Sequence, residues 1–363
     1  MNRTETPPLV VRFGALGDMI MLTPALQAIF DRYKQPVDVV TSGGWSRNLY
    51  DGLEFVGRVR VLKSRKTPYI FDSTQRKIVR ELRARGPGPC WVMEMLSKVY
   101  WLIERGGIPD SMIVKQTELA PKPDEHDVEQ MLRLARIDPP DATPPAEDRG
   151  RAYMPRLHVS DAELEECAAW CRTVGVDPDR AVVVQPGNKR TMHGGWRRRP
   201  SNVKYWPEER WAEVIDRILD TDDRLRVIIN TTPSERPLVE DIRRQLSRDS
   251  MKRTVAGESS LRRLIAMISL AHSCISVDTG PAHIAGAVGC PVVVLFGETS
   301  PRSYRPWAEP GRARIVSRHP EAVEGSIDEA GLSWRQGSRM DAIDPDLVIR
   351  AWKQLPEGDR TEV

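Results

Sequence analysis

One short segment in the C-terminal half of the chain combines side chains and backbone groups that are suited to binding an anion. It reads Asp-Thr-Gly-Pro-Ala-His at 278–283 and lies between two apolar runs, 274–277 and 291–296. Runs of this length, rich in Val and Ile, are typical of buried parallel strands, and the small residues between them predict a short helix. Free N–H groups and the helix dipole meet where such a helix begins, which suits a pyrophosphate. A structural interpretation, in which the Asp and Thr only cap the helix and the His packs beneath it, fits equally well.

The N-terminal end repeats this order of elements. An apolar run at 9–13 predicts a strand, a glycine-rich turn follows, and apolar residues at helical spacing predict a helix over 19–33. Pro24 suits its first turn or kinks it. The Gly-x-x-Gly turn allows close approach of a ligand to the backbone, but it lacks the third glycine of the dinucleotide fingerprint. Asp18 stands at the helix entrance, where the dipole stabilises a negative charge.

The elements that must position these residues alternate between strand and helix, which predicts parallel sheets flanked by helices. We expect further strands at 37–40, 59–62, 181–184, 225–230 and 252–255. We expect further helices at 78–85, 126–136, 161–173, 208–219, 236–247, 261–270 and 344–355. Residues 91–95 read either as a strand or as the start of a helix over 91–104.

A chain of 363 residues predicts two domains of ordinary size. We place a Rossmann-like α/β domain at 9–176 and a second at 177–340, with a helix at 341–356 packing back on the N-terminal domain. A proline-rich, charged loop at 138–150 precedes the boundary. Ligands of such sheets bind beyond the carboxyl ends of the strands, so the two parallel sheets are expected to face a cleft between the domains.

Composition excludes several classes of protein. Apolar residues make up 40% of the chain and charged residues 29%, as in a soluble globular protein, and the net charge of +3 does not indicate a nucleic-acid binder. Five cysteines in apolar surroundings predict reduced thiols rather than a disulfide framework. No uncharged apolar run approaches the ~20 residues of a membrane span, and the N-terminus lacks the pattern of a signal peptide.

Three motifs occur in an order that matches a known family. The first is Val-Val-Arg-Phe-Gly-Ala-Leu-Gly-Asp at 10–18. The second joins Gln-Pro-Gly at 185–187 to Lys-Tyr-Trp-Pro-Glu-Glu at 204–209. The third runs from the 278–283 segment to Gly-Cys-Pro-Val-Val-Val-Leu-Phe-Gly-Glu-Thr-Ser-Pro at 289–301. Together they resemble the bacterial ADP-heptose:lipopolysaccharide heptosyltransferases, glycosyltransferase family 9.

The resemblance implies a GT-B fold and an inverting, metal-independent glycosyl transfer. A sugar hydroxyl is a poor nucleophile, so a positioned carboxylate must take its proton, and Asp18 matches the family's general base. The nucleoside diphosphate that leaves needs its developing charge stabilised. The implied donor-binding residues are Lys204 for a phosphate, Thr279, Gly280 and His283 for the pyrophosphate, Asp278 for sugar hydroxyls, Glu235 for the ribose, and Ser259 with Ser260 beside the adenine. A solvated charge at a helix start is an equally good interpretation of Glu235.

The chain departs from the family in a long basic loop at 189–199. The guanidinium group of arginine binds phosphate or carboxylate groups through two parallel hydrogen bonds. The loop is therefore a candidate for binding the donor phosphates or an acidic acceptor, with a solvated surface loop as the alternative. Candidate phosphate or acceptor contacts are Gly17, Lys63, Arg190, Arg197 and Arg198. The run Lys63, Arg65 and Lys66 is a surface charge run by default, with an acidic saccharide or anionic lipid as the alternative. Two Asp-Pro-Asp sequences, at 177–179 and 344–346, predict turns and caps, so no catalytic metal is expected.

The leading hypothesis is heptose transfer from ADP-heptose to an acidic saccharide-lipid acceptor, the lipopolysaccharide core. It predicts a location at the cytoplasmic face of the inner membrane, contact with an anionic membrane surface, no cofactor and no nucleic-acid partner. The same family with another donor or acceptor, and a sugar-nucleotide epimerase, are the alternatives. A non-enzymatic polyanion binder using the basic loop is the least favoured hypothesis. The sequence leaves open the sugar, the acceptor position and the oligomeric state.

Overall fold

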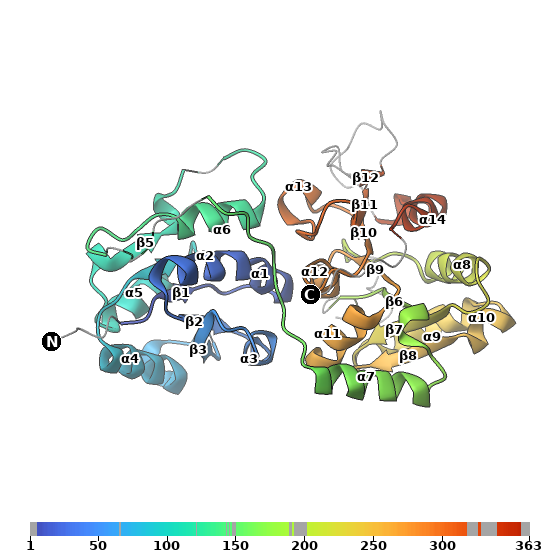
Figure 1. Cartoon of the computed structure of the whole chain (residues 1–363), viewed down its shortest axis with the longest axis horizontal. Coiled ribbons are helices and arrows are strands. Elements are labelled where there is room, and N and C mark those ends of the chain that lie inside the picture. The colour runs from blue at the N-terminus through green and yellow to red at the C-terminus, as the bar shows by residue number, and fades with distance from the viewer. Residues whose placement is uncertain are drawn as a thin grey trace. The chain divides into compact units, whose positions relative to one another are not determined.

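The computed structural model describes residues 6–64, 67–120, 122–142, 144, 146, 150–188, 191, 202–317, 326–327 and 340–356. The chain divides into two compact units, unit 1 over Met1–His158 and unit 2 over Val159–Val363 (Figure 1). Each unit carries a parallel sheet covered by helices, so the α/β class predicted from the alternation of strands and helices is confirmed. No helix in the described part of the chain is both long enough and apolar enough to cross a bilayer.

The described residues of unit 1 form a five-stranded parallel sheet in the order β3-β2-β1-β4-β5. Its strands are β1 (Leu9–Val11), β2 (Val37–Ser42), β3 (Val56–Leu62), β4 (Cys90–Val92) and β5 (Ile113–Lys115). The strands predicted at 9–13, 37–40 and 59–62 are confirmed. Within 91–105 both interpretations hold in part, because β4 ends at Val92 and a helix begins at Ser97.

Helices cover both faces of this sheet (Figure 1). They are α1 (Leu16–Met21), α2 (Thr23–Tyr33), α3 (Ser46–Leu49), α4 (Ser73–Arg85), α5 (Ser97–Arg105) and α6 (Asp127–Ala135). Helices α4 and α5 pack together on the core, while α2 packs against α6. The helix predicted over 19–33 is two helices that break at Leu22, because Pro24 fits the first turn of α2, where its missing N–H has no intrahelical partner to lose.

Unit 2 has a parallel sheet that comprises, among the described residues, seven strands in the order β12-β11-β10-β9-β6-β7-β8. The strands are β6 (Ala181–Gln185), β7 (Arg226–Thr231), β8 (Thr254–Glu258), β9 (Ser273–Val277), β10 (Val292–Phe296), β11 (Ala313–Ser317) and β12 (Ser326–Ile327). The central strands are completely buried, as their continuous apolar runs predict. The predicted strand at 252–255 starts two residues early, because a short helix continues to Lys252.

The helices of unit 2 are α7 (Asp161–Thr173), α8 (Glu208–Leu219), α9 (Arg236–Gln245), α10 (Arg248–Lys252), α11 (Leu261–Leu270), α12 (Gly280–Ala287), α13 (Pro301–Tyr304) and α14 (Pro345–Lys353). Helices α8, α9 and α14 lie on one side of the sheet, and α7, α11 and α12 follow one another on the other (Figure 1). Trp206 and Trp211 pack edge to face at 4.9 Å within the core beneath α8.

Two predictions about the domains are wrong. The predicted boundary after residue 176 assigns α7 to the N-terminal domain, but α7 packs on α11, where Glu163 pairs with Arg262, so the boundary lies after His158. The predicted packing of the helix at 341–356 on the N-terminal domain is wrong too. Helix α14 buries its apolar side in the core of unit 2, and Trp352 Nε1 donates a hydrogen bond to Ser273 Oγ at 2.9 Å.

Candidate functional site

In both sheets the strand order reverses beside the strand that comes first in the chain. In unit 1, β1 pairs with β2 on one side and β4 on the other. In unit 2, β6 pairs with β7 on one side and β9 on the other. Ligands of open α/β sheets bind outside the carboxyl ends of the strands at such a reversal. The residues that follow β1 and β4, and those that follow β6, β7 and β9, are therefore the candidates.

The main pair in unit 2 joins Lys204, from the segment after β6, to Asp278, directly after β9. Lys204 Nζ lies 2.6 Å from Asp278 Oδ2 and 2.7 Å from the main-chain oxygen of the same residue. The aspartate side chain is 7% exposed and the lysine side chain 30%. Since a lysine ammonium has three N–H donors, a third can reach a ligand on the open side. The pair thus combines a neutralised buried carboxylate with an accessible cation.

Helix α12 begins directly after this pair. Thr279 is its extended N-cap residue, yet its side chain makes no capping hydrogen bond, and Gly280 and Pro281 form the first turn. His283 lies one turn further and is buried. The predicted short helix is confirmed. The interpretation of Asp278 and Thr279 as side-chain caps alone is wrong, because the Asp278 carboxylate binds Lys204.

The ends of β6 and β7 are joined by side-chain amides. Asn230 Nδ2 donates to Gln185 Oε1, and Gln185 Nε2 donates to Gly187 O at 2.8 Å. Beside them Glu235 is only 6% exposed, and its Oε2 accepts hydrogen bonds from Thr232 N at 3.1 Å and Thr232 Oγ1 at 2.7 Å. A Cβ at Gly187 would lie 2.9 Å from Glu235 Oε1, so glycine lets the chain pass close to this carboxylate. The interpretation of Glu235 as a solvated charge is wrong.

Hydrogen bonds join residues at the beginning of the basic loop to Asn202, which follows the loop. Asn188 N donates to Thr191 Oγ1 at 2.9 Å, while Asn202 Nδ2 donates to Thr191 Oγ1 at 3.1 Å and to Asn188 Oδ1 at 3.2 Å. Asn202 Oδ1 in turn accepts a hydrogen bond from Lys204 N at 3.1 Å, which connects these residues to the candidate site. The predicted contacts Arg190, Arg197 and Arg198 lie outside the described residues.

Two further predicted donor contacts follow β8. Ser259 is half-buried in the turn between β8 and α11. Ser260 is the N-cap of α11, and its Oγ accepts a hydrogen bond from Arg263 N at 3.3 Å. A capping role therefore accounts for Ser260. The position of Ser259, at the carboxyl edge beside the end of β7, is compatible with a ligand contact, which stays a prediction.

In unit 1, Asp18 is held by the turn that follows β1. It occupies the first turn of α1 after the buried Gly17, and its Oδ2 accepts a hydrogen bond from Ala15 N at 2.7 Å. A Cβ at Gly14 would lie 2.4 Å from Asp18 Cβ, so only glycine at that position leaves room for this carboxylate. The predicted place of Asp18 at the helix entrance is confirmed, and its role as a base stays a prediction.

Three charged residues support the same turn. Arg12 Nη2 contacts both carboxylate oxygens of Asp127, at 3.1 and 3.2 Å, and Arg12 Nη1 donates to Met93 O at 3.0 Å. Glu94, directly after β4, accepts a hydrogen bond from Phe13 N at 2.6 Å. Burial raises the pKa of Asp127, the Arg12 guanidinium opposes that rise, and the negative charge of Asp18 adds to it. Asp18 and Asp127 are therefore close enough for their negative charges to interact.

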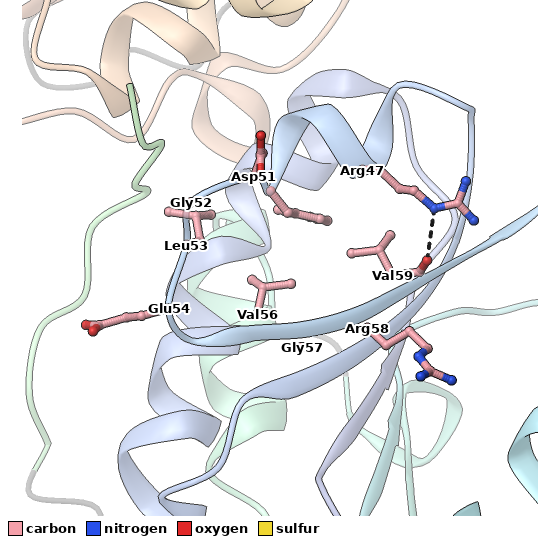
Figure 2. A pocket seen from close by; sticks show the side chains of 10 residues that line it. Arg47, Asp51, Gly52, Leu53, Glu54, Val56, Gly57, Arg58 and Val59 are labelled. Atoms are coloured by element: carbon pink, nitrogen blue, oxygen red, sulfur yellow. Dashed lines mark hydrogen bonds between the residues drawn. The ribbon is translucent and has the colours of Figure 1, made fainter. Parts of the chain in front are cut away.

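A separate cavity lies on unit 1, between α3 and β3 (Figure 2). Its volume is about 570 Å³, and none of the predicted site residues lines it. Arg47 donates from Nε to Val59 O at 3.4 Å, and Asp51, Glu54 and Arg58 stand around the hollow. We therefore locate the candidate site from the side chains at the carboxyl edges of the sheets, and not from this cavity. Among the described residues, no cluster of three or more His, Cys, Asp or Glu side chains is arranged to hold a metal ion.

Sequence reasoning found most of the charged residues of the site but missed several of their supports. Asn230, Glu94 and Asp127 were not singled out. Asn230 and Glu94 each follow a buried apolar run, and a polar residue at the end of such a strand is a usable signal. Asp127 gives no comparable signal, because only the fold brings it to Arg12. Lys63 is exposed at the end of β3 and, within the described residues, makes no contact with the Asp18 turn.

Comparison with known proteins gives a consistent result. Residues 179–326 match the family model described as glycosyltransferase family 9 (heptosyltransferase). Lipopolysaccharide heptosyltransferase 3 of Escherichia coli (strain K12) is 29% identical over 131 residues, which is 36% of this chain and 35% of that protein. The match covers less than half of the length of these curated relatives, for example 43% of lipooligosaccharide heptosyltransferase 2 of Haemophilus influenzae.

Solved structures match over nearly the whole chain. The structure of E. coli ADP-heptose lipopolysaccharide heptosyltransferase II has a TM-score of 0.69 at 20% identity and covers 96% of this chain and 97% of that one. The glycosyltransferase family 9 structure from Veillonella parvula has a TM-score of 0.73 at 17% identity and covers 97% of both chains. The expected GT-B class of fold is thereby confirmed.

Proposed function

We propose that the chain is a member of glycosyltransferase family 9 and that it transfers a heptose from ADP-heptose to a lipopolysaccharide core acceptor. The observation that carries this proposal is the contact of Lys204 Nζ with the carboxylate and carbonyl of Asp278 where the order of the unit 2 sheet reverses. A nucleotide sugar needs a cation for its phosphates and a carboxylate for its hydroxyls, and this pair supplies both within one contact.

The donor half of the reaction rests on charge. When ADP leaves, negative charge develops on the phosphate oxygen released from the sugar. The accessible side of the Lys204 ammonium and the first N–H groups of α12 stabilise that charge, with His283 behind them. Asp278 accepts from sugar hydroxyls, and the buried Glu235 binds the ribose. Ser259 borders the adenine. In this arrangement the protein's own cations and amides neutralise the leaving group, so the proposed transfer does not depend on a metal ion.

The acceptor half rests on Asp18. Its carboxylate takes the proton of an acceptor hydroxyl as the new bond from that oxygen to the sugar carbon forms and the bond from the same carbon to the phosphate oxygen breaks. A single displacement of this kind inverts the configuration at the sugar carbon. The turn fixes the carboxylate before substrate binds, because Ala15 N holds one oxygen and glycine at position 14 leaves it room. An acceptor built on lipopolysaccharide core would bring the enzyme to the cytoplasmic face of the inner membrane.

Replacement of Asp18 by Asn tests the assignment. The amide keeps the size of the side chain but cannot accept the proton, so turnover should fall by about 10²- to 10⁴-fold, the usual contribution of a general base. Affinity for ADP, measured by calorimetry, should change little. The matched control is Asp51→Asn, an exposed aspartate of the same unit that should keep full activity. Turnover by Asp18→Asn at the wild-type rate would refute the base role.

The donor is tested in the same calorimeter. ADP-heptose should bind more tightly than other ADP-sugars and than GDP- or UDP-sugars. Product analysis with and without acceptor separates transfer from epimerisation, because an epimerase would turn over the nucleotide sugar without any acceptor. Tighter binding of a UDP- or GDP-sugar would keep the fold and the family but reject ADP-heptose as the donor.

A further inference from the structure

Large apolar side chains are exposed on two segments of unit 1. They are Ile70 and Phe71 before α4, Met95 and Leu96 before α5, and Trp101 on α5, which we call the apolar patch. Phe71 is 75% exposed, Ile70 69% and Met95 66%. The patch contains five of the nine large apolar side chains that are exposed in the described residues. Single exposed apolar residues need no explanation, but a cluster of this kind marks an interaction surface.

Ring contacts join the two segments of the patch. The Tyr69 and Trp101 rings meet edge to face with their centroids 5.4 Å apart. The guanidinium of Arg105 lies 4.2 Å from the centre of the Trp101 ring and 4.9 Å from that of Tyr69. The segment of Ile70 and Phe71 follows β3, and that of Met95 and Leu96 follows β4, so both lie at the carboxyl edge of the sheet. The patch is thus a preformed feature of that edge.

Positive charge surrounds the patch. Arg76 donates from Nη1 to the carbonyl of Ile70, and Arg105 covers the two aromatic rings. Lys63 donates its main-chain N–H to Thr74 Oγ1, in the first turn of α4, at 3.3 Å. The outer side of α4 adds the exposed cations Lys77, Arg80 and Arg83. Most nearby carboxylates already have partners. Asp72 caps α4, and Glu81 pairs with Arg60 at 3.0 Å and with Lys77 at 3.9 Å, while Glu104 is an exposed negative charge.

We infer that the apolar patch and its flanking cations dock on the surface of an anionic lipid bilayer. Protruding Ile and Phe side chains, aromatic rings beside them, and arginine and lysine around them form the pattern of a surface that enters the boundary between headgroups and acyl chains. The cations add attraction to anionic headgroups. The exposed charges around the patch are mostly positive, and this one-sided charge complements an anionic bilayer better than a protein surface of mixed charge.

The patch also lies beside the acceptor half of the candidate site. Glu94, which holds Phe13 N in the turn before Asp18, is followed at once by the exposed Met95. A bilayer docked here would bring the end of a lipid-linked acceptor toward the Asp18 turn. That consequence rests on the proposed function, but docking itself does not.

Vesicle binding tests the inference. Full-length protein should co-sediment with vesicles of equal parts phosphatidylglycerol and phosphatidylcholine, and only weakly with phosphatidylcholine alone. The double variant Ile70→Ser/Phe71→Ser should reduce affinity for the anionic vesicles by about tenfold or more, because it removes the two most protruding side chains. Lys63→Glu should reduce it about fivefold, and raised salt should weaken wild-type binding.

The matched control is Met251→Ser, an exposed apolar residue of unit 2 that should bind vesicles like the wild type. Asp18→Asn should also bind like the wild type, so loss of the proposed reaction and loss of docking are distinguishable. Equal vesicle affinity of the double variant and the wild type would overturn the inference. A dimer of the free protein that the double variant converts to a monomer, measured by sedimentation velocity, would overturn it as well and assign the patch to a second copy.

Discussion

The turns at the two strand-order reversals hold their charges in different environments. In unit 1 the Arg12–Asp127 pair is closed, with side chains 13% and 10% exposed, and it lies beneath the turn that carries Asp18. In unit 2 the Lys204–Asp278 pair is half open, with its cation 30% exposed. A closed pair can only hold structure, whereas an open pair can exchange one partner for a ligand. The same topology therefore supports a rigid frame for a base in one unit and an adaptable anion site in the other.

The largest expected effect comes from breaking the closed pair. Asp127→Ala leaves the Arg12 guanidinium buried without its carboxylate, so the free energy of unfolding of unit 1 should fall by about 3–5 kcal/mol. Urea denaturation followed by circular dichroism measures the loss. As a control, Asp110→Ala breaks the ion pair of Lys115 with an aspartate that is 67% exposed, and should cost less than about 1 kcal/mol. If both variants unfold at the same urea concentration, the pair is not a structural clamp.

Breaking the open pair should weaken ligand binding more than it lowers the free energy of unfolding. Lys204→Met removes a charge-assisted contact to a phosphate, so ADP affinity should fall by about 10- to 100-fold. It also leaves the Asp278 carboxylate without its cation, so the free energy of unfolding should fall by about 1–3 kcal/mol, less than for Asp127→Ala because water can reach the position of the ammonium. Calorimetry gives the affinity, and Lys252→Met, at an exposed lysine on α10, serves as the control. Unchanged ADP affinity, or a loss of stability as large as that of Asp127→Ala, would remove the distinction between the two pairs.

The two turns also differ in how far sequence could predict them. Both strand–turn–helix units were found from apolar runs and glycine spacing, because buried parallel strands and tight turns leave local signals. Asp18 and Asp278 were found for the same reason. The Arg12–Asp127 pair joins residues 115 positions apart in the chain, and no local pattern reports it. The position of α14 was mispredicted for a related reason, since an amphipathic helix shows that it has an apolar face but not which sheet covers that face.

Helix α7 offers the smallest but most specific test, because it decides where the two units divide. Glu163 binds Arg262 of α11 through both oxygens, at 2.6 and 2.5 Å, and this contact lowers the pKa of Glu163 to about 2. Since the folded pKa lies below the ordinary value of 4.5, the contribution to stability is complete above pH 4.5 and is lost as the pH falls toward 2. With the side chain 24% exposed, we expect about 1 kcal/mol at neutral pH.

Glu163→Gln should therefore lower the stability of unit 2 by about 1 kcal/mol at pH 7 and by progressively less as the pH falls through about 2, because the wild type loses the same contribution as Glu163 becomes protonated. Thermal unfolding across this pH range measures the difference between the two proteins. Glu165→Gln, on the exposed side of the same helix, should match the wild type at every pH. Unit 1 should show no change in either variant. A destabilisation of unit 1 by Glu163→Gln would instead mean that α7 belongs with the N-terminal half, and that the boundary predicted after residue 176 describes the folding units better than the one after His158.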